Sequence, residues 1–190
     1  MSKLYFKYGA MNSGKSLFLL ATAHNFTERN IPYIIIKSTI DTRDNGIIKS
    51  RALKSEKPCI NVDSNANLYT IAADALKDKS IQWVLVDEAQ FLTPKQIDEL
   101  ADVVDFLNID VICYGLRTDF QTKLFPGSAR LFEVADKFEE MKSTCACGNR
   151  ASINARLDKD GKITKVGSQV EVGSEDKYIT LCRKCFKKLS

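Results

Sequence analysis

Gly9-Ala10-Met11-Asn12-Ser13-Gly14-Lys15-Ser16 is the stretch of this 190-residue chain that decides its fold. It fits the pattern G-x-x-x-x-G-K-[ST], in which backbone N–H groups turn inward and form a cradle for phosphate oxygens. Residues 4–8 before it are typical of a strand, and the apolar residues 17–21 after it open a helix. Strand, loop and helix in this order are the context that the motif requires. The alternative is a glycine-containing turn that binds nothing, and the complete pattern argues against it.

The residue types of this loop predict how a nucleotide would be held. We expect all eight residues, 9–16, to contact its phosphates, and Lys15 to reach the β and γ phosphates. Ser16 would supply a hydroxyl ligand to Mg²⁺, an ion that keeps several waters and takes few protein oxygens.

The rest of the chain alternates between strand and helix patterns. Strands are expected at 33–36, 60–62, 83–86 and 110–115, and helices at 68–76 and 94–107, with helical periodicity again at 131–135. Such alternation predicts an α/β fold with a mostly parallel sheet flanked by helices. The length allows one such core and a small appended module.

Two acidic residues follow the apolar run 83–86. Asp87 and Glu88 would stand at the carboxyl edge of the sheet, where ligands bind in open α/β folds. We expect Asp87 to hold Mg²⁺ and Glu88 to act on a nucleophile. A strand that ends in solvated charge is the alternative.

A polar segment follows the strand at 33–36. Residues 39–57 are predicted to form a mobile loop, and residues 47–58 are too charged to join the core. Asp41 and Arg43 lie at the ligand edge, although a solvated turn explains them equally well.

The six cysteines include two close pairs. Cys145 and Cys147 form C-x-C, and Cys182 and Cys185 form C-x-x-C. Four thiolates on two turns would close a tetrahedral Zn²⁺ site of the structural kind. Four reduced cysteines without a metal are the alternative. Cys113 is expected to be buried, Cys59 to be a lone thiol, and His24, the only histidine, to lie on the surface.

The net charge of +4 comes from the tail, because residues 1–136 are close to neutral. A basic, cysteine-rich tail leaves nucleic-acid binding open. No apolar run has the ~18 residues of a membrane span, and the N-terminus lacks a signal-peptide pattern. We therefore expect a cytoplasmic protein without membrane contact.

The motifs together match one family in order and spacing. They are the loop at 9–16, Asp41-Thr42-Arg43, Asp87-Glu88-Ala89-Gln90-Phe91, residues 116–120, and two cysteine pairs flanking residues 172–178. On these residues the chain resembles the type II thymidine kinases over nearly its full length.

The resemblance implies a RecA-like P-loop domain over residues 1–141 and a small zinc-binding domain with a lasso loop over 142–190. It implies transfer of phosphate from ATP, with Mg²⁺, to the 5′-hydroxyl of thymidine and deoxyuridine in nucleotide salvage. It also implies a cytosolic homotetramer, inhibition by thymidine triphosphate, and a partner set without nucleic acid or membrane.

The resemblance also implies roles for individual residues. Glu88 matches the catalytic base and Arg43 a phosphate-proximal residue, while Ser16, Asp41 and Asp87 match the magnesium site. The nucleotide site would include Asp87, Glu88, Ala89 and Gln90 in addition to the loop. The thymidine contacts would be Met11, Phe91, Leu116, Phe120, Phe125, Val172 and Tyr178. Asn154 departs from the family pattern, since many relatives have threonine there, near the thymine methyl.

Two other functions fit parts of the sequence. A guanine-specific GTPase would carry an Asn-Lys-x-Asp element, and no such string occurs. An ATPase stimulated by nucleic acid would use the basic tail as a zinc ribbon. Dependence of ATP consumption on thymidine, or on DNA or RNA, separates the second function from the kinase.

Overall fold

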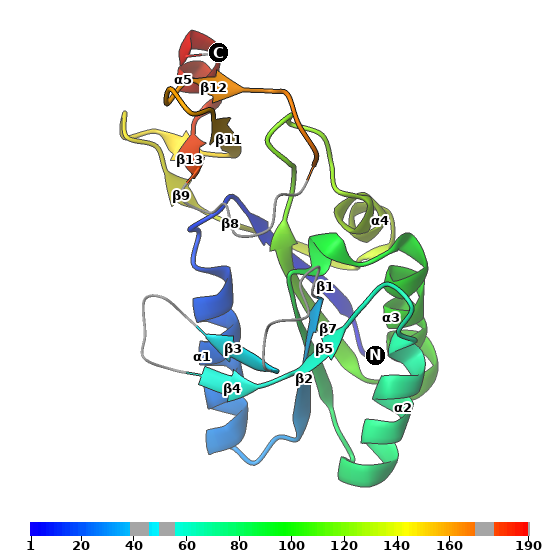
Figure 1. Cartoon of the computed structure of the whole chain (residues 1–190). Helices are drawn as coiled ribbons and strands as arrows, with labels where there is room; N and C mark the ends of the chain where they lie inside the picture. Colours follow the sequence, from blue (N-terminus) through cyan, green and yellow to red (C-terminus); the bar gives the residue numbers. More distant parts are fainter. Residues whose placement is uncertain (39–45, 50–55, 170–176, 190) are drawn as a thin grey trace.

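The computed structural model describes residues 1–38, 46–49, 56–169 and 177–189 (Figure 1). A six-stranded sheet with the order β5-β2-β6-β7-β1-β8 forms its centre, and each neighbouring pair of strands is parallel. The strands are β1 (Leu4–Gly9), β2 (Tyr33–Ser38), β5 (Ile60–Val62), β6 (Trp83–Asp87), β7 (Asp110–Leu116) and β8 (Lys137–Met141). The expected α/β class with a parallel sheet is confirmed.

Helices cover both faces of the sheet (Figure 1). The helix α1 (Lys15–Glu28) packs on one face, while α2 (Leu68–Lys79), α3 (Pro94–Leu107) and α4 (Pro126–Val134) pack on the other. The central strand β6 shows why its sequence is apolar throughout. Val84 and Val86 join the cluster under α2 to α4, whereas Leu85 joins the cluster under α1, so each face of the strand is buried.

Local signals set where two of the helices begin. Thr93 and Gln96 form a capping box at the start of α3, with the Gln96 N–H donating to the Thr93 hydroxyl over 3.2 Å. In α2 the cap is Asn67, whose side chain accepts the Thr70 N–H over 2.7 Å. In both helices the capping residue stands directly before the first helical residue.

The prediction for residues 47–58 is wrong in one respect. The strands β3 (Ile47–Lys49) and β4 (Glu56–Pro58) pair antiparallel, and Ile48 is only 1% exposed. Alternation along β3 turns this one apolar side chain onto the cluster under α1, while its charged neighbour Lys49 stays exposed. Residues 39–45 and 50–55, the rest of the expected loop, lie outside the described residues.

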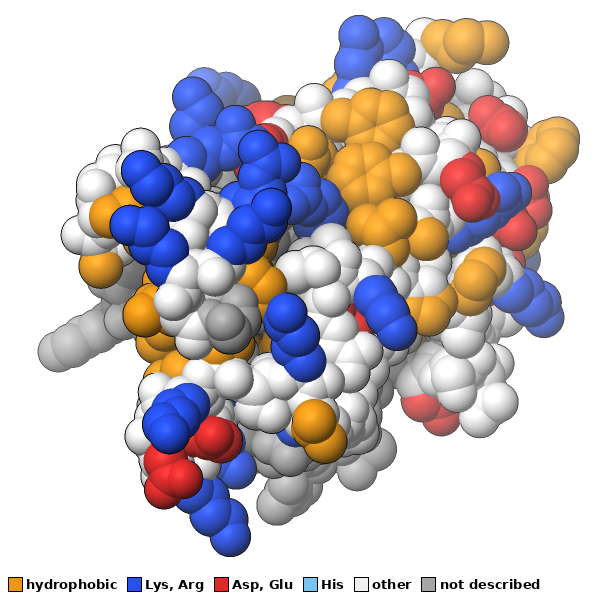
Figure 2. Space-filling view, turned by 90° about the horizontal axis from the view of Figure 1, so that it is seen from above, with side chains coloured by type: hydrophobic (Ala, Val, Ile, Leu, Met, Phe, Trp, Pro, Cys, Tyr) orange, Lys and Arg blue, Asp and Glu red, His pale blue; other side chains and the backbone are white. Residues whose placement is uncertain are grey.

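The C-terminal part forms a separate set of small elements at one end of the main sheet (Figure 1). They are β9 (Ser143–Thr144), β10 (Arg150–Ala151), β11 (Ile153–Leu157), β12 (Ile163–Thr164), β13 (Tyr178–Leu181) and α5 (Arg183–Leu189). They enclose their own apolar cluster, which includes Ala155, Leu181 and Phe186. Seen from this end, the molecule carries many Lys and Arg side chains, as the basic tail predicts (Figure 2).

The strand β8 lies at one of the two edges of the main sheet and was not among the expected strands. Its sequence, Lys-Phe-Glu-Glu-Met, is charged because the strand lies at an edge.

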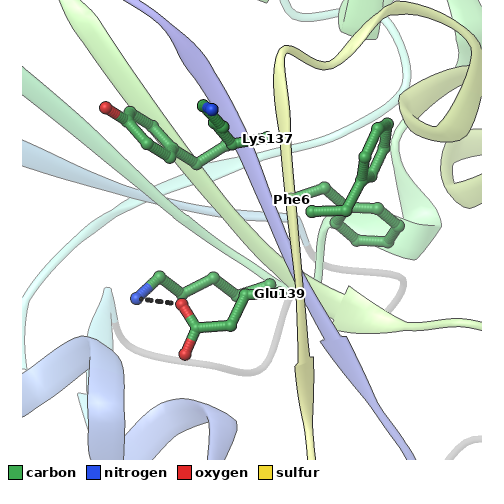
Figure 3. A pocket seen from close by; sticks show the side chains of 6 residues that line it. Phe6, Lys137 and Glu139 are labelled. Atoms are coloured by element: carbon green, nitrogen blue, oxygen red, sulfur yellow. Dashed lines mark ion pairs between the residues drawn. The ribbon is translucent and has the colours of Figure 1, made fainter.

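A shallow hollow at this edge is lined by Tyr5, Phe6, Lys7, Lys137, Phe138 and Glu139 (Figure 3). An ion pair of 2.9 Å joins Lys7 to Glu139 there. None of these lining residues belongs to the motifs that the sequence singles out.

Candidate active site

The candidate site lies where three parallel strands end. The loop 9–16 lies at the end of β1. Asp87 is the last residue of β6, and Glu88 is the residue after it. Residues 117–125 follow β7, the strand that lies between β6 and β1. The Ser16 hydroxyl donates to the Asp87 carboxylate over 3.2 Å. This contact joins residues 71 positions apart and brings the glycine-rich loop and the acidic pair to one edge, as expected.

The glycine-rich loop has the backbone that its sequence predicts. Gly14 has φ +81°, a left-handed conformation that a side chain disfavours, and Lys15 begins α1 directly after it. The Lys15 ammonium donates to the Ala10 carbonyl over 2.8 Å, so it is folded back into the loop. Burial lowers the pKa of Lys15, while Glu88 and Asp87 oppose that shift. The two carboxylates therefore favour the charged form of this lysine.

Asp87 is a buried acid, 3% exposed. Burial and the neighbouring Glu88 carboxylate raise its pKa to about 7. The backbone N–H of Glu88, the Ser16 hydroxyl and Lys37 lower this pKa and so offset part of the rise. A carboxyl group whose charge is so disfavoured gains from a bound cation.

The oxygens of Ser16 and Asp87 fit a magnesium ion. Neighbouring ligands in an octahedral Mg²⁺ site, each 2.0–2.1 Å from the metal, are about 2.9 Å apart, close to the 3.2 Å found here. A hydroxyl and a carboxylate are also the hard donors that Mg²⁺ prefers. These two residues could therefore hold the ion, whereas Asp41, the third expected ligand, lies outside the described residues.

Glu88 is held in a strained but well-defined position. Its backbone has φ +53°, which is uncommon for a residue with a side chain and typical of functional sites. Its carboxylate accepts from the Gln90 amide, and the Gln90 carbonyl oxygen in turn accepts the Leu116 N–H over 2.9 Å. Gln90 is 1% exposed, in the short helix η1 (Ala89–Phe91). The chain thus orients the carboxylate through a buried amide.

Five of the apolar residues expected around thymidine, those on the segments at the ends of β1, β6 and β7, lie near the same edge. Phe91 and Phe125 meet edge to face with ring centroids 5.6 Å apart. Phe120 is buried in the loop after β7, and Tyr178 begins β13, where it pairs with Arg156 of β11. Met11 and Leu116 are half-buried, at the loop and at the end of β7. Val172 and Arg43 lie outside the described residues.

Asn154 links the tail to the loop, a connection that no sequence pattern indicates. Its carbonyl oxygen accepts the Met11 N–H over 2.7 Å, and its amide donates to the Thr118 carbonyl over 3.3 Å. The residue is 3% exposed. Both ends of this side chain are therefore used to join the loop after β1 to the loop after β7.

The four paired cysteines converge as predicted. Their sulfur atoms all lie within 4.8 Å of one another, and those of Cys147 and Cys182 are 3.6 Å apart. A tetrahedral zinc site with Zn–S bonds of ≈ 2.3 Å has its sulfurs about 3.8 Å apart. The turn after β9 carries Cys145 and Cys147, Cys182 lies between β13 and α5, and Cys185 lies in the first turn of α5. The cluster is compatible with zinc.

Comparison with known proteins identifies the family. A family model described as thymidine kinase matches residues 2–186. The thymidine kinase of Zymomonas mobilis is 46% identical over 187 residues, which cover 98% of this chain and 96% of that protein. The thymidine kinase of Enterobacteria phage T4 is 44% identical over 192 residues, which cover 100% and 98%. The chain belongs to the thymidine kinase family.

A third relative agrees. The thymidine kinase of Haemophilus influenzae is 43% identical over 188 residues, which cover 98% of this chain and 97% of that protein. The thymidine kinase family consists of ATP-dependent kinases whose function is the phosphorylation of thymidine. The resemblance seen in the motifs is confirmed, and so is the ATP-dependent phosphorylation of thymidine that it implies.

Proposed function

We propose that this thymidine kinase family member transfers the γ-phosphoryl group of ATP to the 5′-hydroxyl of thymidine, with Glu88 as the proton acceptor. The contact between Ser16 and Asp87 is the observation that carries the proposal. It joins the phosphate-binding loop to the strand end that bears Glu88, so donor phosphate and acceptor hydroxyl would meet at one edge of the sheet.

The loop would bind the triphosphate. Its backbone N–H groups and the N-terminus of α1 offer donors to phosphate oxygens, and the Lys15 ammonium would exchange the Ala10 carbonyl for a phosphate. Mg²⁺, held by Ser16, Asp87 and Asp41, would neutralise charge on the β and γ phosphates. Arg43 would add positive charge near the transferred group.

Glu88 would then accept the proton of the 5′-hydroxyl. The 5′ oxygen forms a bond to the γ phosphorus, the bond between that phosphorus and the β–γ bridging oxygen breaks, and ADP leaves. Gln90 holds the Glu88 carboxylate from the protein side, which limits the positions that the base can take. General-base catalysis of this kind contributes typically 10²–10⁴-fold.

The nucleoside would bind beside the loop that follows β7. We propose that Met11, Phe91, Leu116, Phe120 and Phe125 form its apolar wall, with Val172 and Tyr178 contributed by the tail. Deoxyuridine would also be a substrate, because it differs from thymidine only in lacking the 5-methyl group. Asn154 is committed to Met11 and Thr118, so contact with that methyl would fall mainly to apolar neighbours. Thymidine triphosphate, which combines base and triphosphate, is the proposed feedback inhibitor.

The tail would be a small structural domain. We propose that residues 142–190 form it, that residues 1–141 form the nucleotide-binding domain, and that Cys145, Cys147, Cys182 and Cys185 hold one Zn²⁺. Four thiolates leave no open position on the metal, so the ion would stabilise the tail and take no part in the reaction.

We further propose a cytoplasmic homotetramer without nucleic-acid partners. The edge strand β8 supports self-association, because no strand of the described residues pairs with its outer edge, and Phe138 within it is 49% exposed. Within the described ranges, none of the helices combines the length and apolar character that crossing a bilayer demands.

The Glu88→Gln variant tests the assignment of the base. It keeps the shape of the side chain but removes the proton acceptor, so we expect ATP affinity within about threefold of wild type and turnover reduced by roughly 10²–10⁴-fold. Calorimetric titration with ATP and a steady-state assay with thymidine measure the two quantities. Glu133→Gln, on the exposed surface of α4, is the matched control. Turnover of Glu88→Gln close to that of the control would refute the assignment.

A further inference from the structure

Arg156 is a buried arginine outside the motifs discussed so far. It lies on β11 and is 6% exposed. Its guanidinium carbon lies 4.2 Å from the centre of the Phe120 ring, which is a cation–π contact. A fully buried arginine is rare unless its donors are satisfied, so the partners of the guanidinium indicate what the residue does.

Two of those partners are backbone carbonyls of the segment that follows β12. One guanidinium nitrogen donates to the Val166 carbonyl over 2.7 Å, and the other terminal nitrogen donates to the Ser168 carbonyl over 3.2 Å. Because the guanidinium is planar and its donors are fixed in a fork, it can hold both carbonyls in one arrangement. Lysine, with a single ammonium, has no such fork.

Gly167 lies between these two carbonyls and leaves room for the guanidinium. A methyl group built on Gly167 would overlap a terminal nitrogen of Arg156, and the φ angle of this glycine is +125°. The backbone of the segment is therefore shaped around the arginine.

The same segment is also tied to the loop after β7 by two other side chains. The Gln169 amide donates to the Asp119 carboxylate over 2.9 Å, and the Gln121 amide donates to the Lys165 carbonyl over 2.9 Å. Asp119 is 4% exposed and also accepts two backbone N–H groups of its own loop. The loop that carries Phe120 and the segment 165–169 thus form one packed unit with Arg156 inside it.

We propose that Arg156 is a positioning residue for the nucleoside: it fixes the Phe120 ring and the segment 165–169 relative to each other, and so sets the affinity for thymidine. This inference rests on the proposed function, in which Phe120 forms part of the apolar wall around thymidine. The contacts described above lie on the nucleoside side of the site, whereas ATP is held by the loop 9–16. Loss of Arg156 should therefore act on the KM for thymidine and spare the KM for ATP.

Arg156→Met and Arg156→Lys test the proposal in the full-length protein. Methionine keeps much of the apolar stem without a donor, and lysine keeps the charge without the fork. We expect the KM for thymidine to rise roughly 10- to 50-fold in both variants, since neither side chain can hold both carbonyls in the arrangement that the guanidinium fixes. We expect kcat at saturating thymidine and the KM for ATP to stay within about threefold, because these depend on the other half of the site.

Gly167→Ala is a second, independent route to the same effect. It leaves Arg156 in the sequence but displaces its guanidinium, so the KM for thymidine should rise again. The same change should have a smaller effect in the Arg156→Met background, because the two residues act through one contact. Arg150→Met, which removes an exposed arginine from the same region, should leave all three kinetic constants unchanged.

Thermal melting and zinc content of each variant separate positioning from general stability. Equal losses of kcat, ATP affinity and melting temperature would overturn the proposal, as would an unchanged KM for thymidine in all three variants at residues 156 and 167. If only the Arg156→Met variant fails to fold, the KM for thymidine of Arg156→Lys and Gly167→Ala decides, by the same criteria. A wild-type protein without thymidine-dependent turnover would overturn the proposed function and this inference with it, whereas an active wild type with unaltered variants would overturn the inference alone.

Discussion

Replacing Asp87 by Asn should stabilise the protein in the absence of nucleotide and metal, and should do so more strongly as the pH rises. Asp87 is 3% exposed, and its pKa is about 7 in the folded chain against an ordinary value of 3.8. The folded state therefore binds the proton more tightly than the unfolded state does. Stability from this group is complete below pH 3.8 and is lost as the pH rises through 7.

The size of the effect follows from the two pKa values. A difference of about three units corresponds to about 4 kcal/mol at most, since one unit is 1.36 kcal/mol. Part of it is already lost at pH 5, so the stability difference between Asp87→Asn and wild type should widen by about 2–3 kcal/mol between pH 5 and pH 8. Asparagine resembles the protonated carboxyl group and still accepts the Ser16 hydroxyl, so its own contribution should change little with pH.

Urea unfolding followed by tryptophan fluorescence measures this directly. Trp83, the only tryptophan, is on the same strand as Asp87. Asp105→Asn, at an exposed site on α3, is the control and should show no widening. The reasoning fails if Asp87→Asn is no more stable than wild type at pH 8, or if its advantage is the same at both pH values. With Mg²⁺ and ATP present the order should reverse, because only the wild type gains a metal ligand.

Two further predictions concern the tail and the base. Purified protein should contain about one zinc per chain by metal analysis. The Cys182→Ser variant should lose the zinc, and its tail should become sensitive to protease. A folded, active protein without zinc would contradict this prediction. The Gln90→Leu variant should keep its ATP affinity, but its kcat should fall roughly 10-fold or more, because Glu88 loses the amide that orients it. A kcat equal to that of wild type would show that this orientation does not matter.

Much of the site could be predicted because its signals are local. The glycine-rich loop, the apolar strand ending in Asp87 and the two cysteine pairs each lie within a few residues, and each dictates its own backbone shape. Their convergence follows from a parallel sheet, whose carboxyl ends share one edge. The roles of these residues in catalysis stay predictions until variants are measured.

The features that escaped prediction depend on contacts between distant residues. Asn154 and Arg156 are polar residues on a short strand, and only the fold shows that both are buried against the loop after β7. The edge strand β8 is charged because one side of it faces solvent, so it lacks the apolar run that marks β6. Ile48 is a single apolar contact in a polar segment, which is too little for a periodic pattern.

Identification of the phosphorylated product is the most direct test of the central claim, that ATP bound by the loop 9–16 and thymidine bound beside Glu88 meet at one edge of the sheet. Protein incubated with γ-labelled ATP, Mg²⁺ and thymidine should transfer the label to the 5′ position of thymidine, with little ADP formed when thymidine is omitted. ATP consumption that is independent of thymidine, or that rises on addition of DNA or RNA instead, would contradict the account.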